Sequence, residues 1–154
     1  MTKPRARILF VAHTTRIGGA TNSLFLLVRH LKNQYDVAVL VPEEGILCEW
    51  LATEGVPYFV LPGLRANTLL QVFQLIRRER FDLVYGNNPS RRARNVMLAA
   101  KMAPVPFIWH FRGVMWGLDW RLGLFVRFAD AVVAVSQATA ESLNRFYPSQ
   151  KIHV

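Results

Sequence analysis

A glycine pair early in the chain could bind a negatively charged group. The segment Arg16-Ile17-Gly18-Gly19-Ala20 follows an apolar run of strand length and precedes a helical pattern. Glycine allows close approach of a ligand to the backbone and tolerates positive φ, and the N–H groups that open the next helix attract anions. A plain connecting loop explains the pair equally well, because neither GxxxxGK[ST] nor GxGxxG is present.

A polar cluster, Gly86-Asn87-Asn88-Pro89-Ser90, comes directly after another apolar run. Asparagine and serine side chains both donate and accept hydrogen bonds, so they can bind sugar hydroxyls. They are also common turn residues, which is the simpler interpretation of the cluster taken alone. The sequence leaves both interpretations open.

A third apolar run ends in Trp109-His110-Phe111-Arg112-Gly113, which supplies an imidazole and a guanidinium. His110 could orient a hydroxyl or donate to a developing charge, and Arg112 could bind a phosphate through its planar fork of donors. A lone histidine at a strand end is also a common structural residue. Residue type alone therefore makes His110 a candidate without assigning its role.

Other kinds of chemistry find no support in the sequence. No pair of carboxylates is placed as general acid and base, and no Ser/His/Asp or Cys/His set suggests a hydrolase. No Cys/His cluster has the spacing of a zinc site, so no metal and no cofactor are expected. Ser136 is explained as the N-cap of a helix.

These candidate residues follow predicted strands, which alternate with helical patterns along the whole chain. The predicted strands are Arg7–Ala12, Asp36–Val41, Pro57–Leu61, Leu83–Tyr85, Pro106–Trp109 and Ala131–Val135, with another beginning at Lys151. Apolar positions at helical spacing predict helices around Leu24–Leu31, Leu47–Leu51, Leu69–Ile76, Val96–Met102, Leu118–Phe128 and Leu143–Phe146. The alternation predicts an α/β, Rossmann-like, doubly wound parallel sheet, in which ligands bind at the carboxyl ends of the strands.

Composition sets the size and setting of this fold. The chain has 154 residues, of which 52% are hydrophobic and 19% charged, as expected for one globular domain over 1–154. The single cysteine, Cys48, favours a reducing, cytoplasmic compartment, and charges interrupt every apolar run before it reaches membrane-spanning length. The terminal strand pattern suggests that the chain continues in a longer protein.

The net charge of +9 indicates a polyanionic ligand or surface. Much of the charge falls in Arg77-Arg78-Glu79-Arg80 and Arg91-Arg92-Ala93-Arg94. Nucleic acid, anionic lipid or a phosphorylated substrate would suit it. Each cluster is equally well explained as the solvated face of a helix.

Four segments in order along the chain resemble glycosyltransferase family 4. They are Ile8-Leu9-Phe10-Val11-Ala12-His13 with Gly18-Gly19-Ala20, Phe81-Asp82-Leu83-Val84-Tyr85-Gly86-Asn87, Ile108-Trp109-His110-Phe111-Arg112 and Ala129-Asp130-Ala131-Val132-Val133-Ala134-Val135-Ser136. The resemblance implies the N-terminal, acceptor-side half of a retaining GT-B glycosyltransferase. It also implies a C-terminal donor-binding domain outside this chain, without which the chain would be inactive.

The resemblance also implies roles for the candidate residues. The loop of Gly18, Gly19 and Ala20 would approach the diphosphate of a nucleotide-sugar donor, and His110 would contact the donor sugar in a metal-free transfer. Many relatives have a histidine where this chain has Asn87-Asn88. We expect acceptor or cleft contacts from Arg16, Asn87, Asn88, Ser90 and Arg112.

The acceptor class follows from the same resemblance. Many relatives build polysaccharide, lipopolysaccharide or glycolipid at the cytoplasmic membrane face, so a glycan or lipid-linked acceptor is expected. Trp116, Trp120 and nearby arginines would suit peripheral contact with anionic lipid, although a core-packing helix explains Leu118–Phe128 more simply. The alternative function is a stand-alone basic module that binds nucleotide, phosphorylated ligand or nucleic acid, but no nucleic-acid motif is present.

Overall fold

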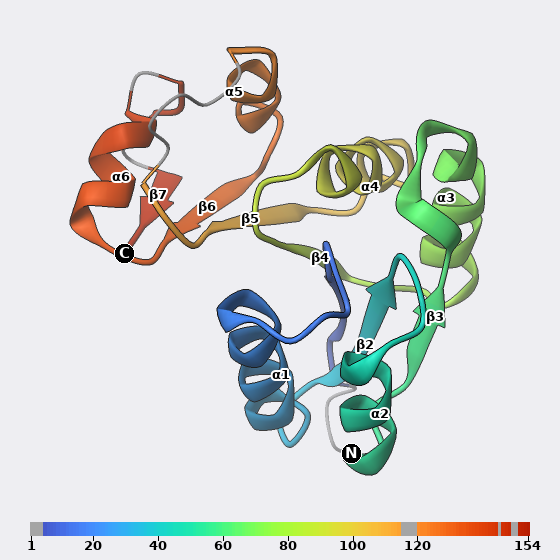
Figure 1. The fold of residues 1–154 in the computed structure, drawn as a ribbon. Helices are drawn as coiled ribbons and strands as arrows, with labels where there is room; N and C mark the ends of the chain where they lie inside the picture. Colours follow the sequence, from blue (N-terminus) through green and yellow to red (C-terminus); the bar gives the residue numbers. More distant parts are fainter. Residues whose placement is uncertain (1–4, 115–119, 145, 149–150) are drawn as a thin grey trace.

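The chain folds around one parallel β-sheet (Figure 1). The computed structural model describes residues 5–114, 120–144, 146–148 and 151–154. The strands are β1 (Arg7–Val11), β2 (Asp36–Val41), β3 (Tyr58–Val60), β4 (Leu83–Asn87), β5 (Phe107–Phe111), β6 (Ala131–Ala134) and β7 (Ile152–His153). All neighbouring strands pair in parallel, in the order β3-β2-β1-β4-β5-β6-β7.

Helices connect the strands, as a parallel sheet requires. They are α1 (Gly19–Leu31), α2 (Ile46–Thr53), α3 (Leu69–Arg78), α4 (Arg91–Met102), α5 (Trp120–Val126) and α6 (Gln137–Leu143), with short 3₁₀ turns η1 (Pro62–Leu64) and η2 (Ala66–Thr68). The chain moves outward from β1 to β3 and then returns to β4 on the other side of β1. The strand order therefore reverses between β1 and β4, where doubly wound sheets bind ligands.

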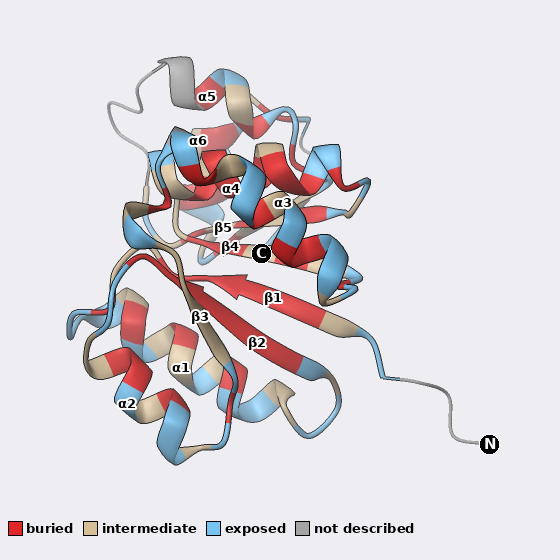
Figure 2. Cartoon of the chain, turned by 90° about the vertical axis from the view of Figure 1, so that its right-hand side faces the viewer, coloured by how far each residue is buried: buried red, intermediate tan, exposed pale blue. Residues whose placement is uncertain are grey.

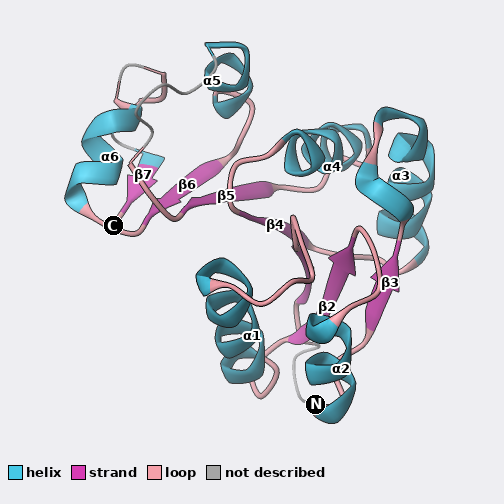
Figure 3. Cartoon of the chain, in the orientation of Figure 1, coloured by secondary structure: helices cyan, strands magenta, loops and turns pink. Residues whose placement is uncertain are grey.

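Helices cover both faces of the sheet (Figure 3). Phe10 of β1 packs with Leu24 of α1 and Leu47 of α2 in one buried cluster. Leu9 of β1 packs in the other cluster, which contains buried residues of α3, α4, α5 and α6. Strands β1 and β2 are consequently buried between two layers, as the red colouring in Figure 2 shows.

Strand β5 separates an aromatic core from the candidate site. Phe107, Trp109 and Phe111 are fully buried on the α4 side, with ring centroids 5.8 and 5.6 Å apart along the strand. Ile108 and His110 alternate with them and are half-buried on the opposite face. The alternation of side chains along a strand thus directs His110 toward the same face of the sheet that α1 covers at β1.

The structure confirms the predicted Rossmann-like α/β fold and corrects several boundaries. Strands β4 and β5 extend to Asn87 and Phe111, so Asn87 and His110 are strand residues and not loop residues. Helix α4 begins at Arg91, ahead of the predicted Val96, because the side chain of Ser90 caps it at Ala93 N. The last predicted helix ends at Leu143 and does not reach Phe146.

The fifth helix has a mixed surface. Val126 is buried, as predicted for a core-packing helix, whereas Leu124 is 47% exposed. The helix ends at Val126 and not at the predicted Phe128, which lies in the following turn and is 56% exposed. Trp116 and the side chain of Trp120, which were expected to support membrane contact, lie outside the described residues. Among the described helices, none has the length and apolar character needed to cross a membrane.

Candidate functional site

The carboxyl ends of β1, β4, β5 and β6 surround a cavity of about 500 Å³. Residues from four connections line it: Gly19, Ala20, Ser23, Asn88, Arg112, Gly113, Val114 and Val135. The cavity lies beside the strand-order reversal between β1 and β4, the position at which this kind of sheet binds its ligand. It is therefore the candidate functional site.

Asn87 joins three parts of this site. Its side chain is 1% exposed; the amide nitrogen donates to the carbonyl of Ala20 at 3.1 Å, and the amide oxygen accepts from Arg112 Nε at 2.7 Å. The described contacts thus use both ends of the amide. Asn87 holds Arg112 against the first turn of α1.

His110 is half-buried and paired with a tyrosine. Its Nδ1 lies 2.7 Å from the hydroxyl of Tyr85, and the two rings meet edge to face with centroids 5.8 Å apart. Burial, assisted by the Arg112 cation, lowers the pKa of His110 to about 4, while burial raises the pKa of Tyr85 to about 12. Both groups are neutral near pH 7. When the tyrosine hydroxyl donates to Nδ1, the imidazole carries its hydrogen on Nε2 and can donate to a ligand.

The glycine loop is open, and its glycines do not adopt positive φ, which was one of the two reasons that the sequence offered for them. Gly18 is extended at φ 175°, and neither Gly18 nor Gly19 is among the positive-φ glycines of the described chain. A Cβ atom at either glycine would meet nothing within 4 Å. The fold itself does not require glycine there, so the absence of side chains serves to leave space above the start of α1.

The other predicted site residues occupy different positions. Asn88 lines the cavity at a φ of 80°, a conformation that asparagine tolerates, and its carbonyl accepts from Trp109 Nε1 at 3.2 Å. The hydroxyl of Ser90 caps α4, accepting from Ala93 N at 3.0 Å. Arg16 is exposed on the loop before α1 and does not line the cavity. Of the predicted site residues, Gly19, Ala20, Asn88 and Arg112 line the cavity. Asn87 and His110 pair with each other at the ends of β4 and β5 and are not among the lining residues.

With this geometry in place, comparison with known proteins identifies the family. Residues 17–154 match the model of Glycosyltransferase Family 4. The chain belongs to this family. A comparison with curated protein sequences finds no match.

Solved structures share the fold of this family 4 domain. Anabaena HepE in complex with UDP-glucose superimposes with a TM-score of 0.81 at 20% identity, covering 96% of this chain and 43% of HepE. The lipopolysaccharide outer core galactosyltransferase WaaB gives 0.76 at 13% identity, covering 96% and 44%. A putative UDP-N-acetylglucosamine 2-epimerase from Listeria monocytogenes gives 0.75 at 12%, covering 97% and 45%. The chain spans less than half of each of these proteins, and the resemblance confirms the expected GT-B fold.

Sequence analysis did not assign two residues that lie at the candidate site. His13 follows β1, and its buried Nδ1 has no hydrogen-bond partner among the described residues. Nη1 of Arg92, in the first turn of α4, donates to the carbonyl of His13. His13 could have been found by the rule that residues following strands face the ligand edge, whereas Arg92 was hidden in an arginine cluster.

The candidate site has no side chains suited to hold a metal ion within the described part of the chain. The described residues contain no group of three or more His, Cys, Asp or Glu side chains arranged to hold a metal ion. The candidate site is built from amides, arginines, an imidazole and backbone groups. Its chemistry is therefore that of binding and orienting hydroxyls and anions.

Proposed function

We propose that this domain is the acceptor-side half of a retaining glycosyltransferase that transfers a hexosyl group from a nucleotide-sugar to a glycan or lipid-linked acceptor. The family match over residues 17–154 carries the proposal. The cavity of about 500 Å³ at the strand-order reversal supplies a place for the reacting groups. The same fold occurs in an epimerase structure, so the reaction rests on the family and not on the fold.

A uridine nucleotide is the donor type that we propose. The HepE structures hold UDP, UDP with glucose, or UDP-glucose. The likeness to WaaB, which is described as a lipopolysaccharide outer core galactosyltransferase, supports an acceptor from polysaccharide, lipopolysaccharide or glycolipid synthesis. Such an acceptor would place the enzyme at the cytoplasmic face of a membrane, in peripheral contact with it.

Each part of the site has a proposed role in a metal-free transfer. The open backbone at Gly18 and Gly19 would approach the donor diphosphate, where the free N–H groups of α1 favour negative charge. His110, held by Tyr85, would donate to the reacting sugar. A neutral imidazole suits this role because it donates without a change of protonation state.

A second, donor-binding domain is part of the proposal. The chain spans 43% of HepE, which supports a second domain in the full-length protein. The donor-side acid and basic residues would belong to that domain. We expect the 154-residue chain to fold and to show no transfer activity. The competing function, a stand-alone basic module, predicts ligand binding by the chain without any sugar transfer by a longer protein.

The experiment that tests the function is a turnover assay of the full-length protein with a panel of nucleotide-sugars. Release of nucleotide that depends on an added acceptor would support the transferase, and the anomeric configuration of the product by NMR tests retention. Absence of turnover with every donor, together with nucleic-acid or nucleotide binding by the 154-residue chain, would favour the module instead.

A further inference from the structure

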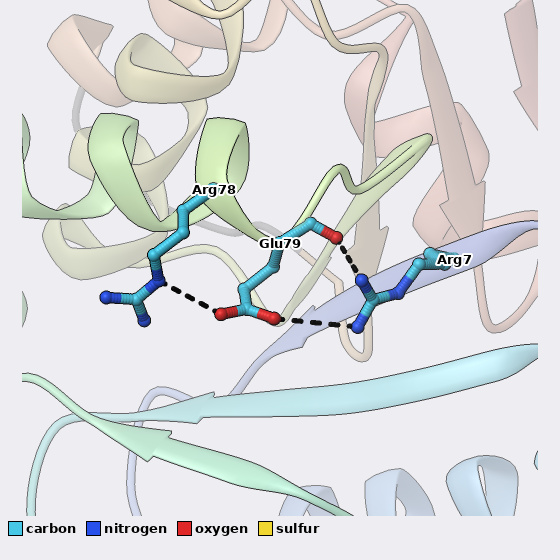
Figure 4. Close-up of polar contacts among 3 residues, drawn as sticks. All are labelled: Arg7, Arg78 and Glu79. Atoms are coloured by element: carbon cyan, nitrogen blue, oxygen red, sulfur yellow. Dashed lines mark hydrogen bonds and ion pairs between the residues drawn. The ribbon is translucent and has the colours of Figure 1, made fainter.

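Cations at the amino edge of the sheet, where the parallel strands begin, are paired with carboxylates. All five ion pairs among the described residues lie there: Arg7–Glu79, Arg29–Glu54, Lys32–Glu54, Arg78–Glu79 and Lys101–Asp130. Figure 4 shows the carboxylate of Glu79 between Arg78 and Arg7, at 3.0 and 3.6 Å. Each of these five cations thus has a carboxylate partner, although Glu54 and Glu79 are each shared by two of them.

The arginines at the carboxyl edge lack such partners. Arg16, Arg91, Arg92 and Arg112 follow β1, β4 and β5, and none forms an ion pair with a carboxylate of the described residues. The acids Glu43 and Glu44 of this edge follow β2, which β1 separates from β4. A half-buried guanidinium without a counter-charge is unfavourable, so an anion from outside the chain would stabilise this edge.

Arg112 is positioned in advance for such an anion. Its Nε donates to Asn87 at 2.7 Å, and its two terminal nitrogens have no hydrogen-bond partner among the described residues. Its guanidinium lines the cavity of about 500 Å³, and burial lowers its pKa. Because a guanidinium presents its donors as a rigid planar fork, fixing Nε leaves the other donors oriented for two oxygens of one ligand.

His13 lies near two of these arginines, Arg92 and Arg112. Burial lowers the pKa of its imidazole, the backbone of Asn87 acts in the opposite direction, and the nearby cations of Arg92 and Arg112 lower the pKa further. Its Nδ1 is buried and unpaired among the described residues, while its carbonyl accepts from Arg92. The imidazole of His13 therefore lies near two guanidiniums at the carboxyl ends of the neighbouring strands β1 and β4.

We infer that the acceptor of this enzyme carries an oxyanion, a phosphate or a carboxylate, which binds to Arg112 and Arg92 beside His13. This inference rests on the proposed transferase function and names its substrate class. The donor diphosphate would lie at the glycine side of the same cavity, over the open backbone at Gly18 and Gly19, and the acceptor anion at its Arg112 side. Binding of the acceptor's anionic group to the arginines would orient the acceptor so that the acceptor's reacting hydroxyl faces the cavity.

Inorganic phosphate is the probe for the site. Its binding to the 154-residue chain is followed by amide chemical shifts in NMR spectra at constant ionic strength. A parallel titration with acetate tests binding of a carboxylate. We expect saturable shifts at His13, Arg92 and Arg112, and a dissociation constant that rises roughly 10-fold or more in Arg112→Gln, because a hydrogen bond to a charged group is lost. Tighter binding of phosphate than of acetate would assign the acceptor group as a phosphate.

Two further variants keep the test interpretable. Arg77→Gln removes the same charge from the exposed end of α3, at the amino edge, and should leave binding unchanged. Arg112→Lys retains the charge but lacks the planar fork of donors, so it should also weaken phosphate binding. This variant replaces Arg112→Gln in the test if Arg112→Gln fails to fold. Equal weakening by Arg77→Gln and the Arg112 variants would overturn the inference, because it would indicate a general charge effect.

The full-length protein separates the acceptor from the donor. Saturating UDP should leave phosphate binding at Arg112 intact. The enzyme should transfer sugar faster to anionic acceptors than to neutral analogues, and Arg112→Lys should abolish this preference. Displacement of phosphate by UDP would overturn the inference, since the anion site would then belong to the donor. Phosphate binding at Arg112 in a protein without sugar transfer would instead remove the proposed function alone.

Discussion

The side-chain oxygen of Asn87 accepts a hydrogen bond from Nε of Arg112 at 2.7 Å. The same amide donates to Ala20 at the start of α1, so one residue with 1% exposure connects the ends of β4 and β5 to the glycine loop. A buried amide with partners at both ends is rigid, because each unmade bond would leave a desolvated polar group. The geometry of the site depends on this residue.

Replacing Asn87 with alanine should therefore weaken both stability and anion binding. We expect the free energy of unfolding to fall by about 1–3 kcal/mol, since Ala20 and Arg112 lose a buried partner. Denaturant unfolding and the phosphate titration measure the two effects. Asn22→Ala, on the exposed face of α1, should change neither by a measurable amount.

Sequence patterns were sufficient for the fold because the strands are continuous apolar runs. Asp36–Val41 is the same strand in sequence and structure, since a buried parallel strand is apolar on both faces. Boundaries failed where polar residues continue a strand: Asn87 and His110 look like loop residues but pair with each other across β4 and β5. A single sequence contains no signal for such pairing.

The sequence predicted which residues lie at the site better than it predicted the contacts between them. The rule that ligands bind after strands selected His110, Arg112 and Asn88. It could not show that Asn87 is buried or that Tyr85 holds His110, because both depend on the register between β4 and β5. The sequence offered both positive φ and close backbone approach as reasons for Gly18 and Gly19; the structure has no positive φ at either residue and leaves open space at both.

A side chain at Gly86 should destabilise the core. A Cβ atom there would lie 2.6 Å from the ring of Phe107, which is fully buried beside Trp109. We expect Gly86→Ala to lower the free energy of unfolding by about 1–3 kcal/mol through overpacking. Gly113→Ala is the matched control, because its Cβ atom would meet nothing within 4 Å. Equal stability of the two variants would contradict the packing described for β4 and β5.

Gly19→Ala should separate folding from ligand binding. No atom lies within 4 Å of the added Cβ, so the melting temperature should stay the same or rise slightly, as alanine favours helix over glycine. In the full-length protein, UDP affinity should fall, because the methyl group occupies space proposed for the diphosphate. Thermal unfolding and calorimetric titration of UDP test this pair of outcomes. Unchanged UDP affinity would place the diphosphate elsewhere.

The histidines of the site predict a loss of stability in acid. Burial lowers the pKa of His110 from 6.5 to about 4, and it also lowers the pKa of His13. Between pH 6.5 and about pH 4, His110 binds a proton in the unfolded chain but not in the folded one. The contribution of neutral His110 to the free energy of unfolding is therefore complete above pH 6.5 and is lost as the pH falls toward 4. Urea unfolding from pH 7 to pH 4 measures this slope. His110→Gln should make it shallower, and an identical slope in that variant would contradict the assignment.

His110 itself provides the most direct test of the catalytic proposal. In the full-length enzyme, His110→Ala should lower kcat more than it weakens nucleotide binding. Its proposed partner is a hydroxyl or developing charge on the reacting sugar, which matters most in the transition state. The loss should be roughly 10²–10³-fold, as for other preorganised donors at reacting centres. Turnover, nucleotide affinity and melting temperature are measured on the same preparation.

Tyr85→Phe gives the matched comparison, because it keeps the ring and removes only the hydroxyl that lies 2.7 Å from His110 Nδ1. If Tyr85 positions the imidazole, this variant should lower kcat by a smaller factor than His110→Ala and leave nucleotide affinity unchanged. A histidine that serves only packing behaves differently: both variants would lower the melting temperature, and turnover per folded molecule would remain at the wild-type value. That outcome would remove His110 from the catalytic proposal and leave the anion site at Arg112 unaffected, since Arg112 is held by Asn87 and not by His110.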